Sequence, residues 1–140
     1  MCLLDNGAAS DEEGDITDIP CDYCFHHLFH GSTEITSVSE DFLPVTNLVS
    51  NCYLRLFQDC TSLTTAPELP ATSLEGTCYS NMFSGCSSLN SIKVGYIGNY
   101  DSKYFSSWVS IVADSGTFYY NGSDTLANFG FPSGWTKTQF

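Results

Sequence analysis

The residues best suited to chemistry lie together in the segment CDYCFHHLFH. It carries thiol and imidazole side chains in close succession, from Cys21, Cys24, His26, His27 and His30. Deprotonated thiols and neutral imidazoles are the groups that bind zinc most readily in proteins, and their spacing here could suit a zinc ion. Whether they can converge on one ion depends on the elements that carry them.

A second group of potential ligands is the acidic run of Asp11, Glu12, Glu13, Asp15, Asp18 and Asp22. Carboxylate oxygens are the ligands that calcium prefers. The run lacks the alternating acids, central glycine and terminal glutamate of an EF-hand loop. We therefore interpret it as a solvated acidic loop.

Signals for catalysis are scarce. All three histidines lie in the one segment described above, and the chain contains no G-x-S-x-G motif and no phosphate-binding loop. No pair of acids is placed by a known catalytic motif. We expect a protein that is not an enzyme, with no catalytic residue, no cofactor and no bound metal.

Charge excludes some classes of partner. The chain of 140 residues has a formal net charge of −12, from sixteen acids against four bases. Long-range repulsion would oppose binding to nucleic acid or to an anionic membrane surface. No apolar run approaches the roughly 18 residues that span a bilayer, so we expect no direct insertion into a membrane. The hydrophobic content of 42% is enough for a single core.

An internal repeat organises these residues. Leu43–Leu63 aligns with Leu69–Leu89 at a constant offset of 26 residues, and ten of the twenty-one positions are identical. A weaker copy precedes them, since Cys24–Thr36 matches Cys52–Thr64 at an offset of 28. Self-similarity at such a period is typical of stacked repeat proteins, in which equivalent residues form continuous interior columns.

The repeat register bears on the candidate zinc site. It places Cys24 in an interior column, whereas His26 and His27 align with variable, outward positions. A buried thiol and an exposed imidazole would not easily share a metal, so a structural role is favoured. The predicted columns of buried free thiols are Cys24/Cys52/Cys78 and Cys60/Cys86, and Cys2 and Cys21 remain unassigned.

Each copy predicts a short strand followed by a turn and a brief helix. The residues LTTA before PELP have strand character and end at a proline, which cannot donate to a ladder. The segment TSLEGTCYSNMFSGC has apolar residues at helical spacing, which indicates a turn followed by one or two turns of α- or 3₁₀-helix. Stacking would bring Phe29, Phe57 and Phe83 into one buried column.

The motifs CYLRLFQDCTSLTTAPELPATSL and CYSNMFSGCSSLNSIKV resemble the BspA-like leucine-rich repeats of surface proteins from gut and oral Bacteroidetes and of related phage proteins. The tail resembles the segment that closes such arrays, with landmarks at Trp108, Gly116 to Phe118 and Pro132 to Thr136. The resemblance implies a mainly β (α+β), leucine-rich-repeat-like right-handed solenoid of about three coils with a C-terminal cap. Its parts would be an acidic segment or partial cap at 1–20, repeats at 21–97 and the cap at 98–140.

The resemblance also implies a function. It predicts a non-catalytic adhesion module, extracellular or on a cell surface as part of a longer exported protein, that recognises a host or bacterial surface protein or glycan. The alternative is a structural spacer or assembly element, including a component of a phage virion or tail fibre. A second copy or an upstream domain could cover the N-terminal edge. The outward strand candidates for binding are Thr36, Thr64, Thr65, Asn90 and Ser91.

Overall fold

Regular secondary structure gathers in the C-terminal half of the chain. The computed structural model describes residues 21–98, 101–121 and 130–140. The elements in chain order are the 3₁₀-helix η1 (Glu40–Phe42), β1 (Ser91–Val94), α1 (Ser102–Phe105), β2 (Ser115–Tyr120) and β3 (Gly134–Gln139). None of the described helices has the length and apolar character needed to cross a membrane.

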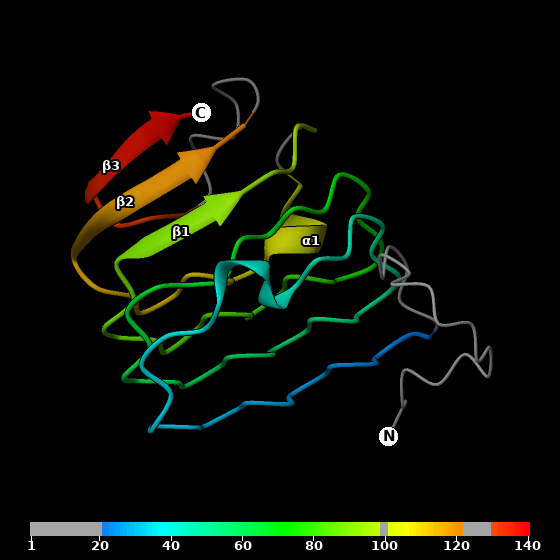
Figure 1. Cartoon of the computed structure of the whole chain (residues 1–140), viewed down its shortest axis with the longest axis horizontal. Coiled ribbons are helices and arrows are strands. Elements are labelled where there is room, and N and C mark those ends of the chain that lie inside the picture. Colours follow the sequence, from blue (N-terminus) through cyan, green and yellow to red (C-terminus); the bar gives the residue numbers. More distant parts are fainter. Residues whose placement is uncertain (1–20, 99–100, 122–129) are drawn as a thin grey trace.

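The strands form one parallel sheet in the order β1-β2-β3, seen at the upper left of Figure 1. Its register places Ile92 opposite Phe118, and Phe118 opposite Lys137. Since side chains alternate along a strand, Ile92 and Val94 of β1 face the core while Ser91 and Lys93 face outward. In β3 the single buried residue is Trp135.

Two glycines allow the strands to start close to their neighbours. A Cβ at Gly116 would lie 2.4 Å from the carbonyl oxygen of Asn90, and one at Gly134 would lie 2.3 Å from that of Asp114. Both neighbours are backbone atoms, which cannot swing away as a side chain would. Glycine is therefore needed where β2 and β3 begin.

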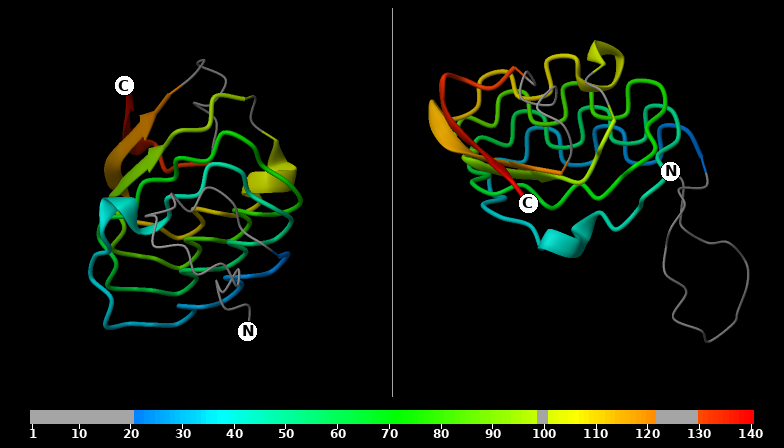
Figure 2. Two further views of the ribbon diagram at one scale, coloured as in Figure 1. Left: turned by 45° about the vertical axis from the view of Figure 1, so that its right-hand side comes forward. Right: turned by 90° about the horizontal axis from the view of Figure 1, so that it is seen from above.

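Turn-rich segments are stacked beside the sheet, and we call them layers. The first, second, third and fourth layers are residues 21–31, 51–60, 77–86 and 103–111. Backbone N–H groups of each layer donate to carbonyls of the next, for example from Phe29 to Leu56, from Phe57 to Met82 and from Phe83 to Trp108, at 3.0, 3.0 and 2.8 Å. Figure 2 shows these zigzag segments lying over one another.

The layers are successive turns, and the prediction of a brief helix within each copy is wrong. Residues with positive φ recur at every fourth position of the second layer, at Asn51, Arg55 and Asp59. A right-handed helix cannot hold such residues. Alternate N–H groups, which a helix would use internally, are donated to the neighbouring layer, and the others bond three residues back within the layer.

The prediction of a right-handed solenoid of about three coils with a C-terminal cap is also wrong. Over the residues that the structure describes, it has one open, three-stranded parallel sheet and little helix. Two of its strands, β2 and β3, come from residues 98–140, which the prediction assigned to the cap. The predicted strand at Leu63–Ala66 is reduced to Thr65, which forms single bridges with Ser37 and Ser91.

Proline explains that difference. Pro67 follows Ala66 directly and has no N–H to continue a ladder, so pairing is interrupted after the bridge at Thr65 and returns only as a single bridge between Leu69 and Val94. The segment Ser91–Val94 contains no proline and forms the strand β1. The later copy, rather than the most regular one, therefore starts the sheet.

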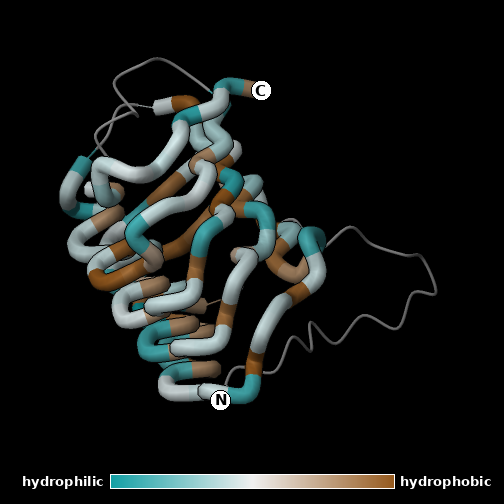
Figure 3. Tube along the Cα trace, turned by 90° about the vertical axis from the view of Figure 1, so that its left-hand side faces the viewer, coloured by the Kyte–Doolittle hydropathy of each residue, from teal (hydrophilic) through white to brown (hydrophobic). Residues whose placement is uncertain are grey.

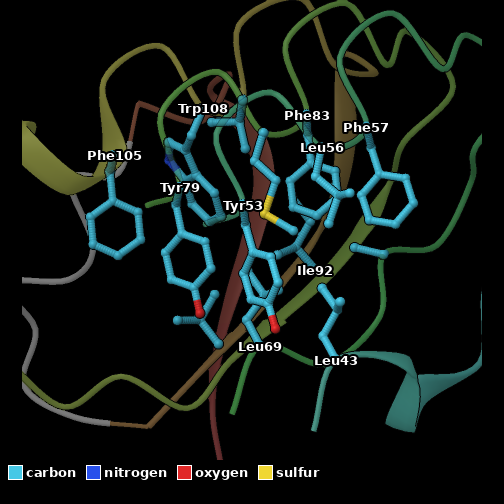
Figure 4. Packing of buried hydrophobic residues seen from close by; sticks show 14 of the residues in the cluster. Leu43, Tyr53, Leu56, Phe57, Leu69, Tyr79, Phe83, Ile92, Phe105 and Trp108 are labelled. Carbon is cyan, nitrogen blue, oxygen red and sulfur yellow. The ribbon is translucent and has the colours of Figure 1, made fainter. Parts of the chain in front are cut away.

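The core is built from columns of equivalent side chains. Phe29, Phe57 and Phe83 lie in one column, with ring centroids 5.4 and 5.7 Å apart and rings within 11° and 5° of parallel. The stacking of these residues is thus confirmed, with Phe57 and Phe83 fully buried and Phe29 only partly so. Figure 4 shows Phe57 and Phe83 side by side, with Tyr53 and Tyr79 forming a neighbouring column. Figure 3 shows apolar positions recurring from level to level.

Some predictions fall outside the described residues. The proposed partial cap at 1–20 and most of the acidic run lie there. Of that run only Asp22 is described, and it is exposed.

Candidate functional site

The outward side of the sheet carries a shallow hollow of about 390 Å³, which we call the strand-face groove. It combines carboxylates, hydroxyls, one ammonium group and two aromatic rings. Its lining residues are Glu40, Thr65, Ala66, Glu68, Ser91, Lys93, Tyr119 and Phe140. They come from η1, the bridge region at Thr65, β1, β2 and the end of the chain, so the groove crosses the sheet.

Strand alternation explains why polar groups line this side. Ser91 and Lys93 point outward from β1 because Ile92 and Val94 occupy the core. Tyr119 points outward from β2 in the same way, between the buried Phe118 and Tyr120. The parallel register places Lys93 opposite Tyr119.

Lys93 is the best-fixed group in the groove. Its ammonium nitrogen lies 2.9 Å from a carboxylate oxygen of Glu68 and 4.7 Å from the centre of the Phe140 ring. The two charged side chains are 40% and 31% exposed, so solvent screens the pair and its contribution to stability is small. What the contacts provide is a defined position for a cation beside an aromatic face.

Backbone contacts hold the rim of the groove. The Glu68 N–H donates to the carbonyl of Glu40 at 2.9 Å, and the Leu69 N–H donates to the carbonyl of Lys93 at 2.9 Å. These hydrogen bonds hold the segment at residues 68–69 beside Glu40 on one side and beside Lys93 on the other. Glu40 itself is exposed, and its carboxylate is available at the edge of the groove.

The structure separates the predicted binding residues into two groups. Thr65 and Ser91 line the groove and pair with each other as an isolated bridge. Thr36, Thr64 and Asn90 are exposed and form a ladder beside it, in which Thr64 N–H donates to Thr36 and Asn90 N–H to Thr64, both at 2.9 Å.

The remaining groove residues were missed in the sequence. They are Glu40, Ala66, Glu68, Lys93, Tyr119 and Phe140. The alternation in SIKV is a signal that could have identified Lys93, because Ile92 and Val94 on the inward side require it to face outward. Tyr119 and Phe140 carry no such signal, since they reach the groove only through the pairing of β2 and through the chain's path after β3.

The residues considered as zinc ligands, for which the sequence favoured a structural role, lie in the first layer. Cys21 and Cys24 form a disulfide, so the prediction that Cys24 is a buried free thiol is wrong. No described layer lies beyond Cys24 as the first layer lies beyond Cys52, and Cys24 is only partly buried. Among the described residues, no group of three or more histidine, cysteine or acidic side chains is placed to hold a metal ion.

The three histidines of the first layer have neighbouring rings, with His27 stacked on His30 and tilted against His26. The ring centroids of His26 and His27 are 4.0 Å apart, and those of His27 and His30 are 5.1 Å apart. Desolvation lowers the pKa of His26 and of His27, and the nearby Arg55 guanidinium lowers both further. His30 lies 3.4 Å from a carboxylate oxygen of Asp59.

The other predicted thiols are free and buried, as expected: Cys52, Cys60, Cys78 and Cys86. Burial raises the pKa of Cys52, Cys78 and Cys86 to about 12. A thiol with so high a pKa is a poor nucleophile at neutral pH. Their arrangement supports packing rather than catalysis.

Two of these thiols also join neighbouring layers. Cys60 donates its S–H to the carbonyl of Phe29, and Cys86 to the carbonyl of Phe57, each at 3.0 Å. The acceptor belongs to the preceding layer in both cases. Cysteine at this position is therefore a small buried donor that fits between closely stacked layers.

Comparison of the chain with protein-family models, with curated proteins and with solved structures gives no match. The resemblance to BspA-like repeats accordingly stays a prediction, carried by the repeat motifs alone. Function has to be argued from the groove and its chemistry.

Proposed function

We propose that the chain is a non-catalytic binding module that recognises a surface glycan through the strand-face groove. The observation that carries this proposal is the position of Lys93, fixed between Glu68 and the Phe140 ring. Tyr119 lies opposite Lys93 on the neighbouring strand. Fixed polar groups beside exposed aromatic rings are the combination that orients a small polar ligand in a shallow site.

A sugar ring has both apolar C–H groups and polar hydroxyls, and the groove offers contacts for each. Its C–H groups can lie against the apolar face of an aromatic side chain, while its hydroxyls accept from an ammonium group and donate to carboxylates. Glu40, Glu68, Thr65 and Ser91 supply further polar atoms around Lys93. Charge-assisted hydrogen bonds of this kind are stronger than neutral ones and favour one orientation of the ligand.

A binding role also agrees with what surrounds the groove. Glu68 is paired with Lys93, and the residues that line the groove include no histidine or cysteine. The histidines stand on the first layer, away from the residues that line the groove. We therefore place the groove's contribution in recognition rather than in chemistry.

The proposed location is extracellular, on a cell surface or on a phage particle. The Cys21–Cys24 disulfide supports an oxidising environment, because disulfides persist in exported proteins and are rare in reducing compartments. A longer exported protein that displays this chain would present the groove to host or bacterial glycans.

The test is a glycan array with the full chain, followed by calorimetric titration with the best-bound glycan. Replacing Lys93 with alanine should weaken binding about tenfold, which corresponds to about 1.4 kcal/mol. Lys103→Ala is the matched control, because Lys103 also lies over an aromatic ring, that of Tyr104 at 5.6 Å, outside the groove. Tyr119→Ala should weaken binding, and Tyr23→Ala, at an exposed tyrosine elsewhere, should not.

An array without saturable binding would reject the proposal and favour the alternative of a spacer or assembly element. Equal affinities for the Lys93→Ala and Lys103→Ala variants would reject the groove as the site. The exposed residues of β3, at the edge of an open sheet, are the feature that an assembly role would use.

A further inference from the structure

The outer side of the first layer, which faces away from the second layer, ends in a row of backbone carbonyls. We call it the open end. The carbonyl of Ser50, just before the second layer, and those of Cys52, Leu54, Leu56 and Gln58 within it each accept an N–H from the first layer. The equivalent carbonyls of the first layer belong to residues 22, 24, 26, 28 and 30. Among the described residues none of these five carbonyls accepts a backbone hydrogen bond.

The direction of the ladder restricts what can dock there. At each described interface the earlier layer donates N–H groups and the later layer accepts them. The first layer has already donated those of Tyr23, Phe25, His27, Phe29 and Gly31 to the second. The backbone of the open end therefore offers acceptors alone, and two copies facing each other by this end would place carbonyl against carbonyl. A partner must bring N–H donors at alternate residues.

The columns of apolar side chains also end at the first layer, where their last members are partly exposed. Leu28 is 56% exposed, whereas its counterpart Leu56 in the second layer is 1% exposed. Phe25 and Phe29 pack against the core but remain partly uncovered, whereas Tyr53 and Phe57 are buried. Each column thus has room for one more member. Exposed apolar surface beside unpaired backbone is the usual signature of a docking edge.

Charge indicates what kind of segment fits. The chain has a net charge of −12, and a row of carbonyl oxygens is itself electronegative. The first layer adds the exposed Asp22 and no lysine or arginine. A segment rich in lysine or arginine would be attracted, and one rich in acids would be repelled.

We propose that the open end binds a basic, partly apolar segment of another protein as one additional layer. The segment's alternate N–H groups pair with the carbonyls of residues 24, 26, 28 and 30. Two apolar side chains four residues apart continue the columns that end at Phe25 and Phe29, as Tyr53 and Phe57 do in the second layer. Backbone pairing supplies affinity and the two columns supply specificity, as in other cases of strand or layer addition.

The test uses a synthetic peptide with the sequence of residues 51–60, with serine in place of both cysteines and two lysines added at each end. The full chain, labelled for NMR, is titrated with peptide up to about 1 mM, the range in which a segment that orders on binding is expected to associate. Saturable shifts confined to residues 22–30 are expected. A scrambled peptide of the same composition should produce no saturable shifts there.

Two variants separate the open end from general stickiness. Leu28→Asp should weaken peptide binding at least tenfold. Ile111→Asp is the matched control, because Ile111 is an exposed aliphatic residue (74%) in the fourth layer, and it should leave binding unchanged. Methylating the backbone nitrogen at the position of Phe57 in the peptide should abolish binding, because it removes a donor from the ladder.

Three results would overturn the proposal. The first is the absence of saturable shifts, which would mean that the open end does not accept a further layer. The second is equal binding of the scrambled peptide, which would mean charge attraction alone. The third is self-association of the chain without peptide, measured by sedimentation and lost in Leu28→Asp, which would make a second copy the occupant. None of these results bears on the strand-face groove, which glycan titration tests separately.

Discussion

Replacing Phe57 with alanine tests whether the aromatic column is the centre of the core. Phe57 is 0% exposed, and its ring lies between those of Phe29 and Phe83 at 5.4 and 5.7 Å. A buried phenylalanine replaced by alanine typically costs about 3–5 kcal/mol, through lost burial and the cavity that remains. Loss of two stacked ring contacts places the expected value in the upper half of that range.

The comparison with Phe29 makes the prediction specific. Phe29 is only partly buried and has a ring of the same column on one side, so Phe29→Ala should cost about 1–2 kcal/mol. Tyr23→Ala, at a residue 54% exposed, should change stability by about 0.5 kcal/mol or less. Urea unfolding at constant m-value measures all three variants. A loss below about 1 kcal/mol for Phe57→Ala, or a loss no larger than that of Phe29→Ala, would show that the column is not the core.

Three further predictions concern thiols, histidines and glycines. The four buried thiols should not react with a thiol reagent at pH 8 in the native state, because burial raises their pKa. They should react once the chain is denatured without reductant. If they still do not react after denaturation, they are in disulfides. Because the folded state lowers the pKa of His26 and His27, it binds fewer protons than the unfolded state, so stability should fall as pH drops through about 6.5. The double variant with glutamine at both positions should lose part of this dependence in urea midpoints measured from pH 7.5 to 5.5. An unchanged dependence would exclude these two histidines as its cause. Gly116→Ala should destabilise by about 1–3 kcal/mol through its clash with the Asn90 carbonyl. Gly31→Ala, where a Cβ meets nothing within 4 Å but φ is +72°, should cost about 1 kcal/mol, and equal losses would argue against the close approach of strands at Gly116.

The sequence was sufficient to predict side-chain columns because a repeat makes equivalent residues equivalent in space. The alignment of Phe29, Phe57 and Phe83 needed only the offsets between copies, and the ring stacking confirms it. Backbone conformation was not predictable in the same way. The spacing of Cys78, Met82 and Phe83 fits a helix as well as a ribbon of turns, since both bring positions three to five apart onto one side.

The helix and the ribbon of turns differ in which carbonyls accept hydrogen bonds from the backbone N–H groups. In a helix they bond within the segment, whereas in these layers alternate ones leave it. Arg55 shows how little of this can be read from residue type, because it holds a positive φ that arginine rarely adopts. The neighbouring layers over-determine that conformation, and a single sequence does not display such a constraint directly.

The candidate site was predictable in part for a related reason. Thr65 and Ser91 were identified because outward strand positions follow from the repeat, and both line the groove. Lys93 could have been added from the alternation within β1. Tyr119 and Phe140 could not, because their approach depends on the parallel pairing of segments outside the repeat. Where a site forms between a repeat and a segment outside it, only the residues that the repeat contributes can be predicted from the repeat pattern.

The open end offers a physical reason for one departure of the first copy from the repeat, the serine at position 32 in place of cysteine. Cys60 and Cys86 each donate to a carbonyl of the preceding layer, at Phe29 and Phe57. Ser32 occupies their position in the first copy, and no described layer lies beneath it. A hydroxyl is a stronger donor than a thiol and is readily solvated, so serine suits a position that faces water when free and a partner's carbonyl when a layer is added. The proposed additional layer would therefore receive not only the acceptors of residues 24–30 but also one donor, at Ser32. In the first copy, where serine replaces cysteine, Ser32 would thus supply to the added layer the hydrogen bond that Cys60 and Cys86 make elsewhere.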